Sequence, residues 1–209
     1  MKLTKKKIFV TALVVCLVAI ISLGSLAWFQ ATDEVTNRFT VSTEDTNQRP
    51  DFALDLYEHN ILANGTLGTE EVETNTYTHI APGANLQKDP TVRNAGQYDM
   101  WVRIKVTLTD YSAWEAVLGN DYDFSAILAG VNADWTLDST TVGTDTLVYY
   151  KNTELVAGAE STLFEGVVVP GAFTVDNIPV EFSLNLVAEA IQSDNTGTNP
   201  QEAFNNYWN

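Results

Sequence analysis

The sequence predicts an all-β fold, an antiparallel β-sandwich formed by the part of the chain that follows an apolar leader. Two segments, residues 100–108 and 180–190, alternate apolar and polar residues with a period of two, which is typical of strands with one buried face. Shorter apolar segments bounded by Gly, Pro, Asn or Asp predict further strands at residues 52–57, 76–80, 91–93, 135–137, 146–150 and 163–169. About eight short strands of this kind favour a sandwich.

The first 27 residues are typical of a secretory signal peptide. Lysines at positions 2, 5, 6 and 7 precede an apolar run over residues 8–23, and small residues at 25 and 27 mark a cleavage site between Ala27 and Trp28. We therefore predict a signal helix at 1–27 and one sandwich domain at 28–209. The alternative is a retained anchor, because the 20 residues 8–27 are enough to span a bilayer. Either way the positive flank places the rest of the chain outside the cell.

Three segments predict short helical insertions or caps rather than strands. Residues 112–118 and 124–128 interrupt the strand pattern in the middle of the chain. At the C-terminal end, residues 200–207 predict a helix with Asn199 as its N-cap and Pro200 at its first position.

The charge of the chain excludes nucleic acid as a partner. The formal net charge is −16. Without the four leader lysines, 7 basic residues remain against 27 acidic ones, which gives −20. Such a surface repels phosphates, because proteins bind nucleic acid by neutralising phosphate charge with Lys and Arg. The single cysteine, Cys16, lies in the leader, so the exported part can form neither a disulfide nor a catalytic thiolate.

The sequence predicts no catalytic residue, no metal ligand and no cofactor. The two histidines, His59 and His79, are twenty residues apart and belong to no His-Glu-x-x-His motif, so we expect two solvent-facing strand histidines. No Gly-x-Ser-x-Gly elbow and no Gly-rich phosphate loop occurs. Acidic pairs such as those at 70–71 and 121–123 lack the pattern of a calcium loop. We therefore expect that the protein is not an enzyme.

Cleavage after Ala27 leaves a strand-like segment at the new N-terminus. It begins with Trp28 and Phe29, and it continues with apolar Val35, Phe39 and Val41 alternating with polar residues. Such a strand can add to the sheet edge of another molecule. Because head-to-tail addition does not close on itself, it yields filaments. The alternative is that this segment pairs within its own sheet, and the two are compatible if the strand exchanges after export.

Three blocks of sequence resemble the TasA/camelysin family of exported Gram-positive proteins. They comprise residues 24–41, residues 81–106 with the run Lys88-Asp89-Pro90-Thr91-Val92-Arg93-Asn94, and residues 187–204. Residues 110–175 match no motif of that family. The resemblance implies a jelly-roll β-sandwich, leader removal by a SipW-type signal peptidase, and a role as a fibre subunit of the biofilm matrix or cell surface. Other matrix proteins or a polysaccharide would be further partners.

Two other functions stay open. Camelysin-like relatives are described as secreted metalloproteases, which would require a zinc site built from residues distant in the sequence. A glycan-binding surface module would use exposed aromatic rings, for which Trp101 on the polar face of its predicted strand is a candidate.

Overall fold

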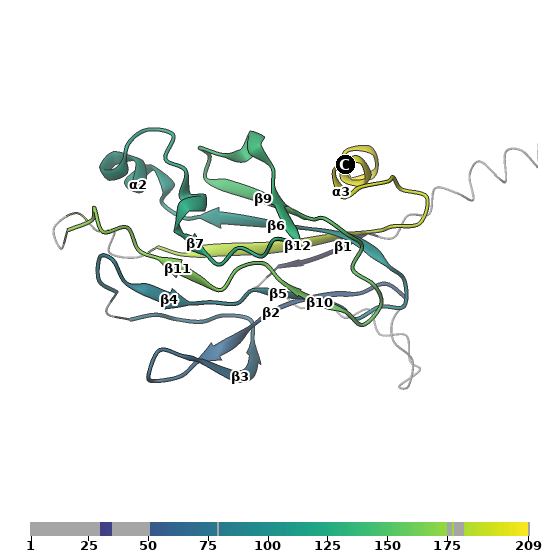
Figure 1. The fold of residues 1–209 in the computed structure, drawn as a ribbon, viewed down its shortest axis with the longest axis horizontal. Helices are drawn as coiled ribbons and strands as arrows, with labels where there is room; N and C mark the ends of the chain where they lie inside the picture. Colours follow the sequence, from purple (N-terminus) through teal and green to yellow (C-terminus); the bar gives the residue numbers. More distant parts are fainter. Residues whose placement is uncertain (1–29, 35–50, 79, 175–176, 178–181, 209) are drawn as a thin grey trace, which may run out of the picture.

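Antiparallel β-sheets are the main secondary structure in the part of the chain that the structure, a computed structural model, describes: residues 30–34, 51–78, 80–174, 177 and 182–208. The sheets lie in two layers, with short helices around them (Figure 1). This architecture agrees with the predicted all-β sandwich with helical insertions. The predicted signal helix at 1–27 lies outside the described residues.

One layer is a five-stranded sheet with β6 at its centre. Its strands, in spatial order, are β1 (Gln30–Glu34), β12 (Leu184–Gln192), β6 (Met100–Leu108), β9 (Thr146–Lys151) and β8 (Trp135–Leu137). The predicted alternation in β6 is confirmed, because Met100, Val102, Ile104, Val106 and Leu108 are each at most 1% exposed. These side chains form the inner face of the sheet, as a period of two requires.

The facing layer consists of two smaller sheets. One has the order β10 (Glu160–Thr162), β5 (Thr91–Asn94), β2 (Leu54–Ile61) and β3 (Leu67–Val72); the other has β4 (Asn85–Gln87), β11 (Gly166–Val168) and β7 (Leu128–Ala129). Leu54 and Leu56 of β2 and Val92 of β5 are buried in the same core as Ile104 and Leu186 of the first layer. The two layers thus enclose one continuous apolar core.

One end of this core is closed by the middle of the chain. The helix α2 (Tyr111–Leu118) and the 3₁₀ helix η1 (Phe124–Ile127) follow β6, and a second 3₁₀ turn, η2 (Ser139–Thr141), follows β8. Trp114 of α2 is fully buried, and its ring lies 5.0 Å from the rings of both Phe173 and Phe182. Edge-to-face packing of this kind stabilises the closure.

The C-terminal helix α3 (Pro200–Tyr207) lies on the outer face of the five-stranded sheet (Figure 1). The predicted N-cap is confirmed, because the side chain of Asn199 accepts a hydrogen bond from the backbone N–H of Glu202. Phe204 of α3 packs with Trp101, Tyr150 and Ile191 in a second apolar cluster. Trp101 does lie on the outer face, as its period predicts, but α3 covers it and leaves it 6% exposed. The prediction of an exposed, sugar-stacking Trp101 is therefore wrong.

Most predicted strands are confirmed within a few residues, and the exceptions have local causes. Residues 76–78 and 80 form no strand, and the Tyr77 hydroxyl instead donates a hydrogen bond to the Gln87 carbonyl oxygen at 2.5 Å. Residues 124–128 form a 3₁₀ turn followed by β7 rather than one helix. The strands β3, β4, β7 and β10 were not predicted, because each is short or rich in Gly, Thr, Asn and Glu.

Candidate binding groove

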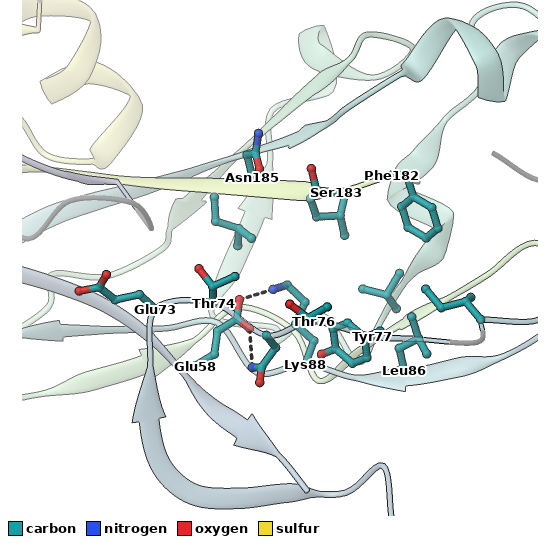
Figure 2. Close-up of a pocket in the computed structure, with 15 residues that line it drawn as sticks. Glu58, Glu73, Thr74, Thr76, Tyr77, Leu86, Lys88, Phe182, Ser183 and Asn185 are labelled. Carbon is teal, nitrogen blue, oxygen red and sulfur yellow. Dashed lines mark hydrogen bonds and ion pairs between the residues drawn. The ribbon is translucent and has the colours of Figure 1, made fainter. Parts of the chain in front are cut away.

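A groove of about 450 Å³ opens between the two layers beside the first residues of β12 (Figure 2). Its apolar wall combines both layers, with Leu86 and Val167 from β4 and β11 and Phe182, Leu184 and Leu186 from the β12 segment. The opposite wall is polar, and Glu58, Lys88 and Asn75 form it together with Thr74 and Thr76. A groove that lies beside a strand edge and has an apolar wall suits an extended peptide in which every second side chain is apolar.

The edge of β12 forms the rim of this groove. β12 pairs with β6 along its whole length, from Leu184 opposite Leu108 to Gln192 opposite Met100. On its other side, β1 pairs only with Val187–Ile191. Among the described residues, the stretch from Leu184 to Leu186 therefore has no strand on the β1 side. This stretch is an edge to which a strand can add.

A buried ion pair forms the polar wall. Glu58 and Lys88 contact each other through carboxylate and ammonium, and their side chains are only 2% and 11% exposed. Asn75 donates a second hydrogen bond to the Glu58 carboxylate at 3.1 Å. An isolated charge would be costly to bury here, so each group depends on its partner. The pattern of β2 places Glu58 on the inner face, because Leu54 and Leu56 precede it at a spacing of two.

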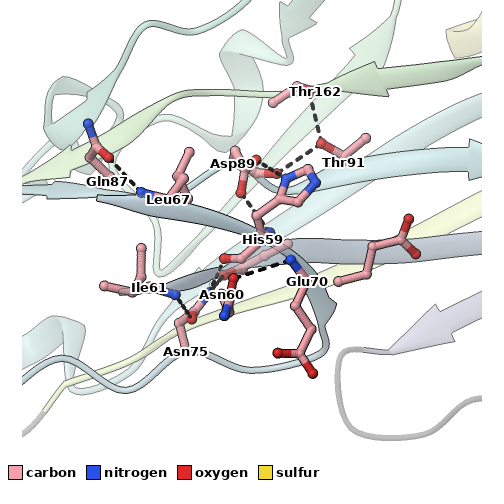
Figure 3. A network of polar contacts seen from close by, with 12 residues as sticks. His59, Asn60, Ile61, Leu67, Glu70, Asn75, Gln87, Asp89, Thr91 and Thr162 are labelled. Carbon is pink, nitrogen blue, oxygen red and sulfur yellow. Dashed lines mark hydrogen bonds and ion pairs between the residues drawn. The ribbon is translucent and has the colours of Figure 1, made fainter. Parts of the chain in front are cut away.

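His59 and Asp89, which follow Glu58 and Lys88 in the sequence, hold the polar wall of the groove in place (Figure 3). The backbone N–H of His59 donates to one carboxylate oxygen of Asp89 at 2.9 Å, and its Nδ1 lies 2.6 Å from the other. The Asn75 side chain accepts a hydrogen bond from the Ile61 N–H and donates one to the His59 carbonyl oxygen. The Asp89 bonds tie the connection between β4 and β5 to strand β2, and the Asn75 bonds tie the connection between β3 and β4 to the same strand.

Tyr77 closes one end of the groove as a neutral hydrogen-bond donor. Burial raises the pKa of the Tyr77 hydroxyl well above its ordinary value, and the nearby carboxylates of Glu58 and Asp89 raise it further. The hydroxyl therefore keeps its proton and its bond to the Gln87 carbonyl oxygen at any physiological pH.

The structure corrects the expectation about the histidines. His59 does lie in strand β2, but its side chain is only 33% exposed and is paired with Asp89 rather than free in solvent. His79 lies outside the described residues. Within the described ranges, no group of three or more His, Cys, Asp or Glu side chains is placed to hold a metal ion.

The residues predicted for cleavage and strand donation lie outside the described part of the chain. They are Ala27, Trp28, Phe29, Val35, Phe39 and Val41. The segment between them, β1, does pair with β12 of its own sheet, from Gln30 opposite Ile191 to Glu34 opposite Val187. This is the arrangement that the sequence left open as the alternative to donation.

The groove itself was missed at the level of the sequence. The available signal was a lone charge, Glu58, at a position where the period of two demands an apolar side chain.

A second, more polar hollow lies over the sheet of β4, β11 and β7; it is lined by amide and carboxylate groups that include Asn85, Gln87 and Asn132. Its one aromatic lining residue, Phe164, is fully buried, so no ring is offered for stacking on a sugar.

Comparisons with known proteins add no assignment, since no family model, no curated protein and no solved structure matches the chain. None of the helices in the described ranges has the length and apolar character needed to cross a membrane.

Proposed function

We propose that the chain is an exported structural protein of the extracellular matrix or cell surface of a Gram-positive bacterium. After leader removal, copies join head to tail, and each copy places its N-terminal strand against β12 of the next. The resemblance to the TasA/camelysin family supports this reading. The groove beside β12 supports it independently, because among the described residues the first part of β12 is a strand edge without a partner on the β1 side, and it lies beside an apolar wall.

The register of β1 on β12 is the observation that carries the proposal. Continued past Glu34, the same antiparallel register sets Val35 opposite Leu186 and Phe39 opposite Phe182. Opposite residues of an antiparallel pair share a face of the sheet. The two apolar side chains would therefore enter the groove, where Leu186 is buried and Phe182 half-buried.

The polar residues of the segment fit the same register. Thr36 and Arg38 fall opposite Asn185 and Ser183, both of which are exposed. A shift by one residue would instead turn the apolar set to solvent. The alternation in the segment and the two faces of β12 are thus complementary.

Exchange between copies needs no new contacts. A strand from a second copy can take the register that β1 has within its own chain, so the exchanged and unexchanged forms have the same local bonds. The groove that accepts a strand and the strand that is donated are different surfaces of one molecule, and repeated exchange therefore gives an open filament.

The order in which the strands are connected is part of this proposal. We propose a jelly-roll connection of the strands, since several neighbours in the sheets are far apart in sequence, such as β12 beside β6 and β10 beside β5. Long connections between neighbouring antiparallel strands are typical of Greek-key and jelly-roll folds.

Electron microscopy of two exported chains tests the function. A chain that begins at Trp28 should form filaments, and a chain that begins at Glu44 should not. Equal filaments from both would remove strand donation. Mass spectrometry of the secreted N-terminus tests cleavage between Ala27 and Trp28. We expect an N-terminus at Trp28 only when a SipW-type peptidase is present.

A pair of substitutions makes the same test without truncation. Phe39→Asp and Thr36→Asp each add one negative charge to the segment. Phe39→Asp would bury a carboxylate in the apolar part of the groove and should abolish filaments. Thr36→Asp faces solvent in the proposed register and should leave them intact. Loss of filaments in both variants, or in neither, would contradict the register.

We also propose that the protein is not an enzyme. A secreted metalloprotease would show proteolysis that a chelator removes. We expect the purified exported chain to show none, and chelator-sensitive activity that copurifies with the filaments would overturn this proposal.

A further inference from the structure

The ion pair of Glu58 and Lys88 is buried at a place on the inner face of β2 that the period of two assigns to an apolar side chain. Its carboxylate and ammonium lie on the wall of the groove across from the β12 edge (Figure 2). Burying a charge pair seldom adds net stability compared with apolar side chains of the same size, and its best attested use is to set a register. We therefore looked for the residue of a donated strand that would face this pair in the groove.

The register of β1 on β12 indicates one such residue, Asn37. If that register continues past Glu34, Val35 would lie opposite Leu186 and Phe39 opposite Phe182, and the residue between them that would point into the groove is Asn37, opposite Leu184. Its amide carries two N–H donors and one carbonyl acceptor. It is the one polar side chain on the inward face of the alternating segment 35–41.

We propose that Asn37 of the donated strand binds the polar wall formed by Glu58, Lys88 and Asn75 and thereby fixes the register between copies. This inference rests on the proposed strand donation. The Glu58 carboxylate has acceptor sites left beyond its bonds to Lys88 and Asn75, and the amide of Asn37 supplies donors for them.

Slipped registers lack this match. A slip by two residues keeps the inward face inward, but it brings Val35 or Phe39 to the polar wall in place of the amide. The parts of the polar wall that are still exposed, at Lys88 and Asn75, would then lose contact with water without gaining a partner, which is costly. Apolar complementarity alone does not separate registers two residues apart, so the amide supplies the discrimination.

Disulfide trapping measures the register directly, because the chain from Trp28 onward contains no cysteine. One exported chain carries Thr36→Cys, and a second carries either Asn185→Cys or Ser183→Cys. Thr36 lies opposite Asn185 in the proposed register and opposite Ser183 after a slip by two. Mixed dimers between two singly substituted chains form only between copies, and they require the short Cβ–Cβ separation of opposed residues.

In the otherwise native background, we expect mixed dimers through Asn185→Cys to exceed those through Ser183→Cys. Adding Asn37→Ala to the donor chain should reduce this ratio about tenfold, as expected for lost hydrogen bonds to charged groups. Arg38→Ala, on the outward face, is the matched control and should leave the ratio unchanged.

The outcomes separate the two proposals. Filaments and in-register dimers from the native segment, with a ratio that Asn37→Ala does not change, would overturn the role of Asn37 and leave strand donation standing. Absence of filaments and of dimers in either register would overturn both. A tenfold reduction confined to Asn37→Ala supports the inference.

Discussion

The guanidinium carbon of Arg103 lies 4.3 Å from the centre of the Phe204 ring, so the central strand β6 and the C-terminal helix α3 meet through a cation and an aromatic face. The same guanidinium donates through Nε to the Glu189 carboxylate of β12 at 2.5 Å. Lys105 donates to the other oxygen of Glu189 at 2.7 Å. One carboxylate on the outer face thus binds two cations, and α3 covers part of this group.

Glu189→Ala should lower the free energy of unfolding by about 3 kcal/mol, because it leaves the shielded Arg103 without its counter-charge. Glu160→Ala is the control: Glu160 pairs with Arg93, but its own side chain is 48% exposed, so the expected loss is below about 1 kcal/mol. Urea unfolding of both variants measures the difference, and equal losses would contradict a special role for Glu189.

Phe204→Ala should destabilise the attachment of α3. The side chain is 1% exposed and packs 6.0 Å from the Tyr150 ring, so its removal should cost about 3 to 4 kcal/mol. Asn205→Ala lies on the exposed side of the same helix and should cost less than about 0.5 kcal/mol. Exposure of Trp101, followed by fluorescence quenching, should increase only in Phe204→Ala; equal quenching would argue that α3 does not shield it.

Alkaline pH should destabilise the fold through Tyr149. Burial, assisted by the charge of Asp123, raises the pKa of Tyr149 from 10.0 to about 12. Below pH 10 the hydroxyl is protonated in both the folded and the unfolded chain. As the pH rises above that value, the unfolded chain loses its proton first, so stability falls by about 3 kcal/mol until the folded hydroxyl ionises as well.

Tyr149→Phe removes this titration. Urea unfolding at several pH values should show a smaller loss of stability for this variant between pH 10 and about 12. Identical pH profiles of the variant and the native chain would show that other tyrosines carry the alkaline transition.

Salt should accelerate filament formation. From Trp28 onward the chain carries 27 acidic and 7 basic residues, so copies repel one another at low ionic strength. Raising NaCl from about 10 mM to about 150 mM shortens the Debye length from about 30 Å to about 8 Å and should shorten the lag before filaments appear. Sucrose at equal osmolality is the control, and a lag that salt does not change would point to an encounter without charge repulsion.

The sequence predicts the centre of the fold well, because a period of two leaves little choice in a half-buried strand. β6 begins and ends where its alternation does, and the N-cap Asn199 marks the start of α3. Elements that a local sequence pattern specifies in this way can be predicted without knowledge of their tertiary contacts.

Tertiary context decides the rest. Trp101 follows its predicted face, but only the return of α3 onto the sheet shows that this face is covered. Residues 67–72 contain Gly, Thr and two Glu, and they form β3 only because β2 offers an edge for pairing. The groove joins residues 58, 75 and 88 to the start of β12, and no local pattern brings these segments together.

The helix α3 and the groove occupy opposite ends of β12. α3 packs at Ile191, and the groove begins at Leu184. At about 3.3 Å per residue, these two points on the strand are about 23 Å apart. In the proposed filament, an enzyme or epitope fused behind the C-terminal helix would project from the outer face of the sheet, away from the groove between the layers, and a fibre of such fusions would display its cargo at regular intervals.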